Sequence, residues 1–219
     1  LYRRAGRYLE LADLLTLQLE NTWSPSERME LQLERAVLFE EDLDDTERAL
    51  DALRSLQELD PESEVALEGQ ARLYGKEEQW DLALKALGQL ADLVDDPTRL
   101  AETYFRMGEI RERVQGDQER AEHLYQEALS HAPRHLASMA HLIALTSGRG
   151  DWGKTARMLE RAAEAESEAG KQAEHLLRGG EVYLQHLEDE ARGVELLERS
   201  LALAPDQTRA AELLRPLYE

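Results

Sequence analysis

The side chains that could carry chemistry in this chain are its histidines and carboxylates, because it contains no cysteine. Disulfides, cysteine-ligated zinc and thiol catalysis are therefore excluded. The chain has six histidines. His131 and His135 are four residues apart, but they stand on either side of Pro133 and cannot share one continuous helical face as a zinc-binding pair would. We predict that the chain binds no metal.

Carboxylates are abundant, with 46 Asp and Glu against 26 Lys and Arg, so adjacent pairs arise without a function. Glu40-Glu41-Asp42 is typical of a solvated face, and Asp95-Asp96 of a turn before Pro97, rather than of a general acid–base pair. Gly148-Arg-Gly150 lacks the further glycine and the preceding strand of a phosphate-binding loop. The sequence therefore predicts a non-enzymatic protein without catalytic residues, a cofactor site or a metal.

One set of carboxylates has a regular spacing. Glu30, Glu102 and Glu174 recur at one constant interval, each near the start of an expected helix. The favoured interpretation is structural, since a carboxylate suits the positive end of the helix dipole. The alternative is an acidic stripe, which Glu109 and Glu181 would extend, that accepts a basic protein or peptide.

The same interval runs through the whole chain, and we call it the repeat period. Tyr8, Trp80 and Trp152 keep it, as do Pro61, Pro133 and Pro205. A fixed long period is typical of stacked repeats, in which neighbouring units complete one another's core. We expect one repeat segment over residues 1–219, with units 1–72, 73–144 and 145–216. Because the chain opens on Leu1 without an initiator Met, we expect it to be a fragment of a longer protein.

Each unit is expected to hold two helical hairpins of unequal length, giving about twelve helices. One position marks the start of the second helix in every hairpin, and its spacing alternates between a longer and a shorter value: Leu11, Ala49, Ala83, Ala121, Thr155 and Gly193. An aspartate is placed to cap three of these helices: Asp45, Asp117 and Asp189. Small residues in the first helices predict close helix approach: Ala36, Gly108 and Gly180. Tyr8, Trp80 and Trp152 are expected in equivalent, substantially buried environments.

Several of these residues resemble the tetratricopeptide repeat. Ala101–Gly108, Gly116-Asp117, Arg120-Ala121, Tyr125, Ala128-Leu129 and Pro133 are similar to the family's aromatic, Leu/Met-Gly pair, Gly-Asp turn, small packing residue and closing proline. Residues 73–90 resemble a second copy. The chain is thus similar to acidic tetratricopeptide arrays of the bacterial type.

The resemblance implies an all-α fold, an α-solenoid of antiparallel helix pairs in a right-handed superhelix. It implies a concave groove that binds a peptide or a protein, and no catalysis. Some family members grip chaperone C-termini with Lys, Asn and Arg on successive first helices. In this chain the first helices offer glutamates instead, so the resemblance does not extend to that clamp.

The formal net charge of −20 argues against nucleic acid and against anionic membrane surfaces as partners. No apolar run approaches the roughly 20 residues needed to cross a bilayer, so we expect no membrane insertion and a cytoplasmic location. The predicted function is a non-enzymatic scaffold for protein–protein interaction. One alternative is a structural element that self-associates end to end, through Leu9, Leu14, Leu15 and Leu19 at one end and Leu213, Leu214 and Leu217 at the other. The other is a regulatory arm of an enzyme or machine elsewhere in the parent chain.

Overall fold

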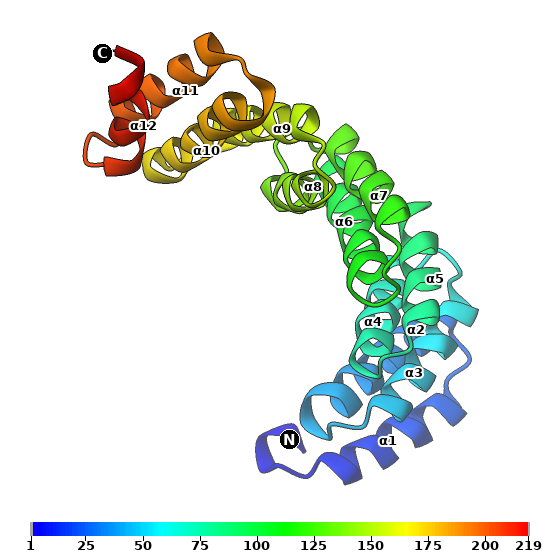
Figure 1. Ribbon diagram of the computed structural model, residues 1–219. Helices are drawn as coiled ribbons and strands as arrows, with labels where there is room; N and C mark the ends of the chain where they lie inside the picture. The colour runs from blue at the N-terminus through cyan, green and yellow to red at the C-terminus, as the bar shows by residue number, and fades with distance from the viewer. Residues whose placement is uncertain (1, 219) are drawn as a thin grey trace. The chain divides into compact units, whose positions relative to one another are not determined.

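The computed structural model describes residues 2–218, and this part of the chain consists of helices and turns without a strand (Figure 1). The predicted all-α fold and the expected number of helices are confirmed. The twelve α-helices are α1 (Tyr8–Asn21), α2 (Pro25–Val37), α3 (Thr46–Leu59), α4 (Glu64–Lys76), α5 (Trp80–Ala91), α6 (Pro97–Arg113), α7 (Gln118–His131), α8 (Leu136–Gly148), α9 (Trp152–Ala165), α10 (Ala169–Val182), α11 (Glu190–Leu203) and α12 (Thr208–Tyr218).

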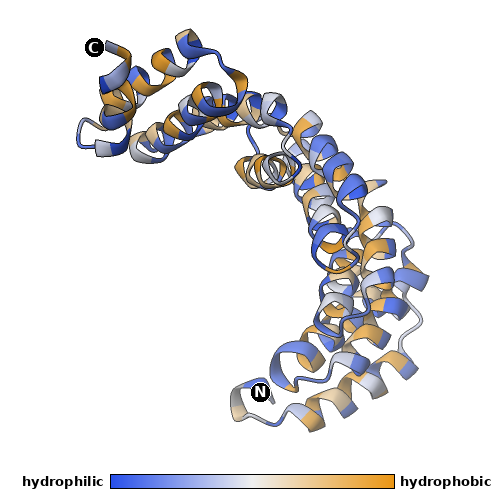
Figure 2. Ribbon diagram, viewed as in Figure 1, coloured by the Kyte–Doolittle hydropathy of each residue, from blue (hydrophilic) through white to orange (hydrophobic). Residues whose placement is uncertain are grey.

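The helices form two compact units, residues 1–95 and residues 96–219. In Figure 2 most helices carry apolar residues on one side and hydrophilic residues on the other, the pattern of helices that pack in layers. In the second unit, buried side chains of α7, α8 and α9 form one core that includes Tyr125, Leu142 and Leu159. The expectation of a single repeat segment over residues 1–219 stays a prediction. No helix within residues 2–218 is both long enough and apolar enough to span a bilayer.

The alternation of longer and shorter hairpins is confirmed. The positions that mark the second helices all fall at the fourth residue of their helix, in α1, α3, α5, α7, α9 and α11, and all are buried. The difference in length arises in the first helices. Helix α6 has 17 residues, and α2 and α10 continue into the π-helices η2 (Leu38–Asp42) and η3 (Tyr183–Leu187). Helices α4 and α8 have only 13 residues.

The predicted aspartate caps are confirmed. The carboxylates of Asp45, Asp117 and Asp189 accept hydrogen bonds from the backbone amides three residues later, at 3.0, 3.1 and 3.1 Å. The amide of Arg48, and then its guanidinium, hold the pKa of the Asp45 carboxyl below its usual value. These bonds satisfy amides that the first turn of a helix leaves without a partner, and so they fix where α3, α7 and α11 begin.

The repeated aromatic residues are equivalent in position but less buried than the sequence predicts. Tyr8, Trp80 and Trp152 are the first residues of α1, α5 and α9, and each is only partly buried. The Trp152 ring stacks on His186 with centroids 3.7 Å apart. A ring at the first residue of a helix lies beside the turn of its hairpin, where neighbouring side chains cover it incompletely.

The small residues mark close helix contacts, as predicted. A Cβ atom added to Gly108 would lie 2.5 Å from Cε1 of Tyr125, and one added to Gly180 would lie 2.7 Å from Cγ of Leu197. Tyr125 and Leu197 are both fully buried, and Ala36 is 3% exposed. The side chains of the second helix therefore pack directly on the backbone of the first.

We expect Gly108→Ala to destabilise the protein although alanine is the better helix former. The added methyl group would overlap the buried Tyr125 ring, and such overpacking costs about 1–3 kcal/mol. Gly88→Ala in α5 is the matched control, because nothing lies within 4 Å of the added Cβ there. This control should gain about 0.5–1 kcal/mol from helix propensity. Equal unfolding midpoints in urea for the two variants would contradict the close contact.

Candidate functional site

The glutamates singled out by their spacing occupy equivalent places in the structure. Glu30, Glu102 and Glu174 are each the sixth residue of a first helix, in α2, α6 and α10, and all three are exposed. The effect of the helix dipole fades beyond the first turn. The preference for carboxylates in the first turn of a helix therefore does not explain glutamates in the second turn. Their repeated exposed position has another cause.

Glu30 lines a hollow of about 260 Å³ between α1 and α2. Its lining residues are Gln18, Thr22, Glu27, Glu30, Leu31 and Glu34. Within the described residues, none of the three carboxylates in this hollow forms an ion pair. Trp23, next to Thr22, is 91% exposed. The repeat pattern gives no signal for Trp23, because no aromatic residue lies one repeat period away.

The other four glutamates lie in the second unit, in pairs on two helices. Glu102 and Glu109 are two turns apart on α6, and Glu174 and Glu181 have the same spacing on α10. Three of them have intramolecular partners. Glu102 Oε2 lies 3.4 Å from His135 Nε2. Arg113 lies 3.4 Å from Glu109, and Arg209 Nε lies 2.9 Å from Glu181. The structure therefore distributes these carboxylates over two helices and does not gather them into one cluster.

A polar cluster joins α6, α7 and α8. The Tyr125 hydroxyl donates a hydrogen bond to Glu112 Oε2 at 2.7 Å, and His141 Nδ1 lies 2.7 Å from the same oxygen. Burial, and then the Glu112 carboxylate, raise the pKa of Tyr125 above its usual range. The tyrosine thus remains a hydrogen-bond donor.

Three further histidines also have structural contacts. His135 caps α8, with Nδ1 accepting from the Ser138 amide at 3.3 Å. His131 stacks on Tyr104, with centroids 5.6 Å apart, and His186 stacks on Trp152.

We expect Tyr125→Phe to lower the free energy of unfolding by about 1–2 kcal/mol, because it removes a hydrogen bond to a charged partner while keeping the buried ring. Tyr104→Phe is the control. The Tyr104 hydroxyl has no hydrogen-bond partner among residues 2–218, so that variant should be neutral. Urea unfolding measures both, and equal stabilities would show that the Tyr125–Glu112 bond contributes nothing.

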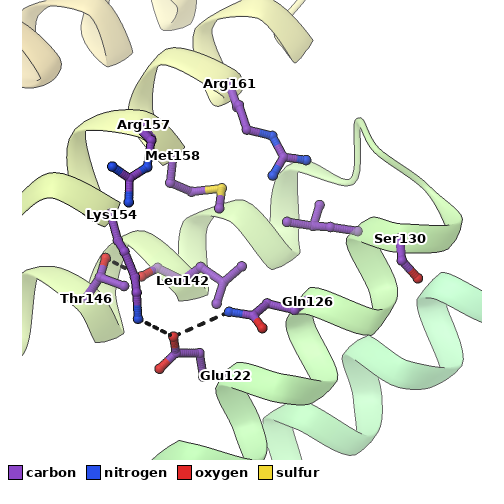
Figure 3. Close-up of a pocket in the computed structure, with 10 residues that line it drawn as sticks. Glu122, Gln126, Ser130, Leu142, Thr146, Lys154, Arg157, Met158 and Arg161 are labelled. Atoms are coloured by element: carbon purple, nitrogen blue, oxygen red, sulfur yellow. Dashed lines mark hydrogen bonds and ion pairs between the residues drawn. The ribbon is translucent and has the colours of Figure 1, made fainter. Parts of the chain in front are cut away.

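A larger pocket lies elsewhere, on side chains that the spacing of the sequence does not mark as a binding site. It has a volume of about 510 Å³ and lies between the second helices α7 and α9, over α8 (Figure 3). We call it the α7–α9 pocket. Its lining residues are Glu122, Gln126, Leu129, Ser130, Leu142, Thr146, Lys154, Arg157, Met158 and Arg161.

Apolar side chains form the floor of the α7–α9 pocket, and charged side chains form its rim. Leu129 and Leu142 are buried below a partly buried Met158. Arg157 and Arg161, one turn apart on α9, are exposed at the rim. Glu122 closes one end, where it pairs with Arg149 and with Lys154 Nζ at 3.3 Å.

A related pocket of about 210 Å³ occurs in the first unit, between α3 and α5. Each of its lining residues lies one repeat period before a residue of the α7–α9 pocket: Arg54, Gln57, Gln70, Tyr74, Leu82, Lys85, Ala86 and Gln89. The same hollow therefore recurs with the period of the sequence. The sequence indicates the recurrent hollow only through Lys85 and Arg157, which are basic residues one repeat period apart. The spacing of apolar residues does not reveal them.

The chain repeats helix pairs of alternating length, with a close contact at a small residue and an aspartate cap in each longer pair. This arrangement is that of the helical repeat proteins called α-solenoids. Within that class, a family model for the tetratricopeptide repeat matches residues 30–63 and 102–135, and these two segments are themselves one repeat period apart. Residues 73–90, which we expected to be the second clear copy, lie outside both matches, although α4 and α5 form a hairpin there.

Solved structures support this classification. YrrB, a tetratricopeptide protein, is 17% identical with a TM-score of 0.55, covering 92% of this chain and 98% of that chain. MamA is 15% identical with a TM-score of 0.59, covering 84% and 96%. PilF of Pseudomonas aeruginosa is 13% identical with a TM-score of 0.57, covering 97% and 91%. Among curated proteins, none matches. Two segments of the chain thus match the tetratricopeptide repeat, and the fold resembles that of the tetratricopeptide protein YrrB, which suggests a scaffold for protein–protein interaction.

Proposed function

We propose that this chain is a non-enzymatic scaffold whose first helices bind a basic or amphipathic protein segment in a groove. The observation that carries the proposal is the exposed glutamate at the sixth residue of α2, α6 and α10. A carboxylate repeated at one place on every second first helix, beyond the reach of the helix dipole, favours a role in ligand binding. Glu109 and Glu181 extend this acidic set, although each already has an arginine partner.

The hollow between α1 and α2 supports a basic ligand. Glu27, Glu30 and Glu34 bring three carboxylates to it, and none of the lining residues described there is basic. A lysine or arginine side chain of the ligand would supply a cation, and its aliphatic part would cover Leu31. The exposed Trp23 ring offers a cation–π contact beside the hollow. YrrB is described as having an unusual peptide-binding site, and peptide binding by that protein makes a peptide ligand a reasonable probe for this one.

We expect Glu30→Gln/Glu102→Gln/Glu174→Gln to slow the association of basic amphipathic peptides and to weaken its dependence on salt. The substitution removes three charges with little change of shape, and exposed charges are screened within about 8–10 Å at physiological ionic strength. Binding rates at low and high salt, measured with fluorescent lysine-rich and arginine-rich peptides, test this expectation.

The matched control is Glu47→Gln/Glu119→Gln/Glu190→Gln. It removes three exposed glutamates from the second helices α3, α7 and α11 and gives the same net charge. This variant should bind the peptides like the original chain. If both variants slow association equally, the effect is one of total charge, and the proposed site on the first helices is wrong.

A further inference from the structure

We propose that the α7–α9 pocket is a second binding site, for an acidic peptide segment that carries an apolar side chain next to its carboxylates. The apolar side chain would enter between Leu129, Leu142 and Met158. The carboxylates would bind the guanidinium groups of Arg157 and Arg161. This inference does not rest on the proposed function, because it concerns the second helices and a ligand of opposite charge.

The two rim arginines differ from their neighbours in forming no ion pair among the residues that the structure describes. Neighbouring cations are paired: Arg149 and Lys154 with Glu122, and Arg192 with Glu160. Within residues 2–218, neither guanidinium group forms a hydrogen bond or an ion pair, although the charge of Arg157 does lower the pKa of Asp151. Beyond Glu122, the wall formed by α7 carries the neutral side chains of Gln126 and Ser130 (Figure 3). The one carboxylate among the lining residues described, Glu122, is already paired with Arg149 and Lys154.

An apolar floor lies between the arginines. Met158 lies between Arg157 and Arg161 on α9 and points into the pocket, above the buried Leu142 (Figure 3). Methionine adapts to ligands of different shape, and arginine binds carboxylates through two parallel hydrogen bonds. The volume of about 510 Å³ lies within the range of ligand pockets. The combination of these groups suits an apolar side chain flanked by acids.

In the related pocket of the first unit, hydrogen bonds among the lining side chains narrow the space. Gln70 Nε2 donates to Gln57 Oε1 at 2.9 Å, and Gln57 Nε2 donates to Gln89 Oε1 at 3.4 Å. Arg54 Nε donates to the Tyr74 hydroxyl at 3.1 Å.

In the α7–α9 pocket the positions of those three glutamines hold Leu129, Leu142 and Arg161, so this amide network cannot form. The pocket is accordingly larger, about 510 against 210 Å³. Its open, apolar and basic character therefore comes from its own side chains and not from the repeat geometry alone.

The same features disfavour a phosphate or nucleic-acid ligand. Glu122 closes one end of the α7–α9 pocket with a carboxylate, and the floor offers leucine and methionine where a phosphate needs hydrogen-bond donors. The net charge of −20 further opposes a polyanion. A short acidic segment reaches the arginines and uses the apolar floor, which a phosphate chain cannot do.

Methionine methyl NMR tests the proposal directly. The chain has four methionines, of which Met158 lines the pocket, while Met29 and Met107 lie on the first helices α2 and α6 and Met139 is buried in α8. The ¹³C-methyl-labelled chain is titrated with capped synthetic peptides that carry a central Leu or Phe flanked by Asp or Glu. We expect the Met158 signal to move, and the signals of Met29 and Met107 to stay. Peptides with Asn and Gln in place of the acids, or Gly in place of the central residue, should bind weakly.

Arg157→Gln/Arg161→Gln should weaken binding by about tenfold, the effect of two partly exposed charge pairs. Both side chains are exposed, so the unfolding midpoint should not change. The control, Lys85→Gln/Arg178→Gln, removes two exposed cations outside the pocket, one of them at the position equivalent to Arg157, and should bind normally. The glutamate variants of the first helices should also bind normally, which separates a failure here from a failure of the proposed function.

The proposal is overturned if no acidic peptide moves the Met158 signal, or if neutral peptides bind as tightly as acidic ones. It is also overturned if the Met158 signal moves with protein concentration alone and Arg157→Gln/Arg161→Gln abolishes that shift. The pocket would then receive a second copy of this chain.

Discussion

The close approach of two helices at one small residue is the contact on which each longer hairpin depends. At Gly108 and Gly180 the second helix places a fully buried side chain, Tyr125 or Leu197, where a Cβ atom would otherwise be. This distance leaves the Tyr125 hydroxyl within reach of Glu112 and His141, so the polar cluster follows from the packing. The aspartate caps act with it, because Asp117 and Asp189 fix the first residue of the helix that must meet the glycine.

Because the backbone geometry recurs from repeat to repeat, the pockets between the helices recur as well. The side chains that line each pocket determine whether it is open to a ligand. The pockets over α4 and over α8 share their lining positions at the repeat period. In the first, glutamine amides bond to one another across the space. In the second, leucine replaces two of these glutamines and can offer only apolar contact. A filled pocket stabilises the unit itself, whereas an open apolar pocket leaves surface that a ligand can cover.

The sequence predicts the parts of this structure that depend on residues close together in the chain. Asp45 as a cap, Thr155 at the fourth residue of α9 and Gly180 as a contact point each depend on helix geometry and local spacing. Partners farther apart are not predicted. Arg209, which is 28 residues away, forms an ion pair with Glu181 and so partly offsets the charge of a glutamate singled out for binding. The α7–α9 pocket is contributed by three helices whose lining residues include both polar and apolar types, so no single periodicity reveals it. The partial burial of Trp80 likewise depends on how a turn covers one ring.

The unpaired arginines in so acidic a chain are consistent with the energetics of exposed charge. An exposed guanidinium keeps its water, so Arg157 and Arg161 cost the folded protein little without an ion pair. That balance changes once a ligand covers the apolar floor between them, because water is displaced and a charge left without a partner becomes unfavourable. A ligand that fills the floor without supplying carboxylates would therefore bind less well than its apolar area suggests. The apolar floor thus increases the preference of Arg157 and Arg161 for a ligand with carboxylates. Selectivity for acidic segments arises from the desolvation of these arginines as much as from charge attraction.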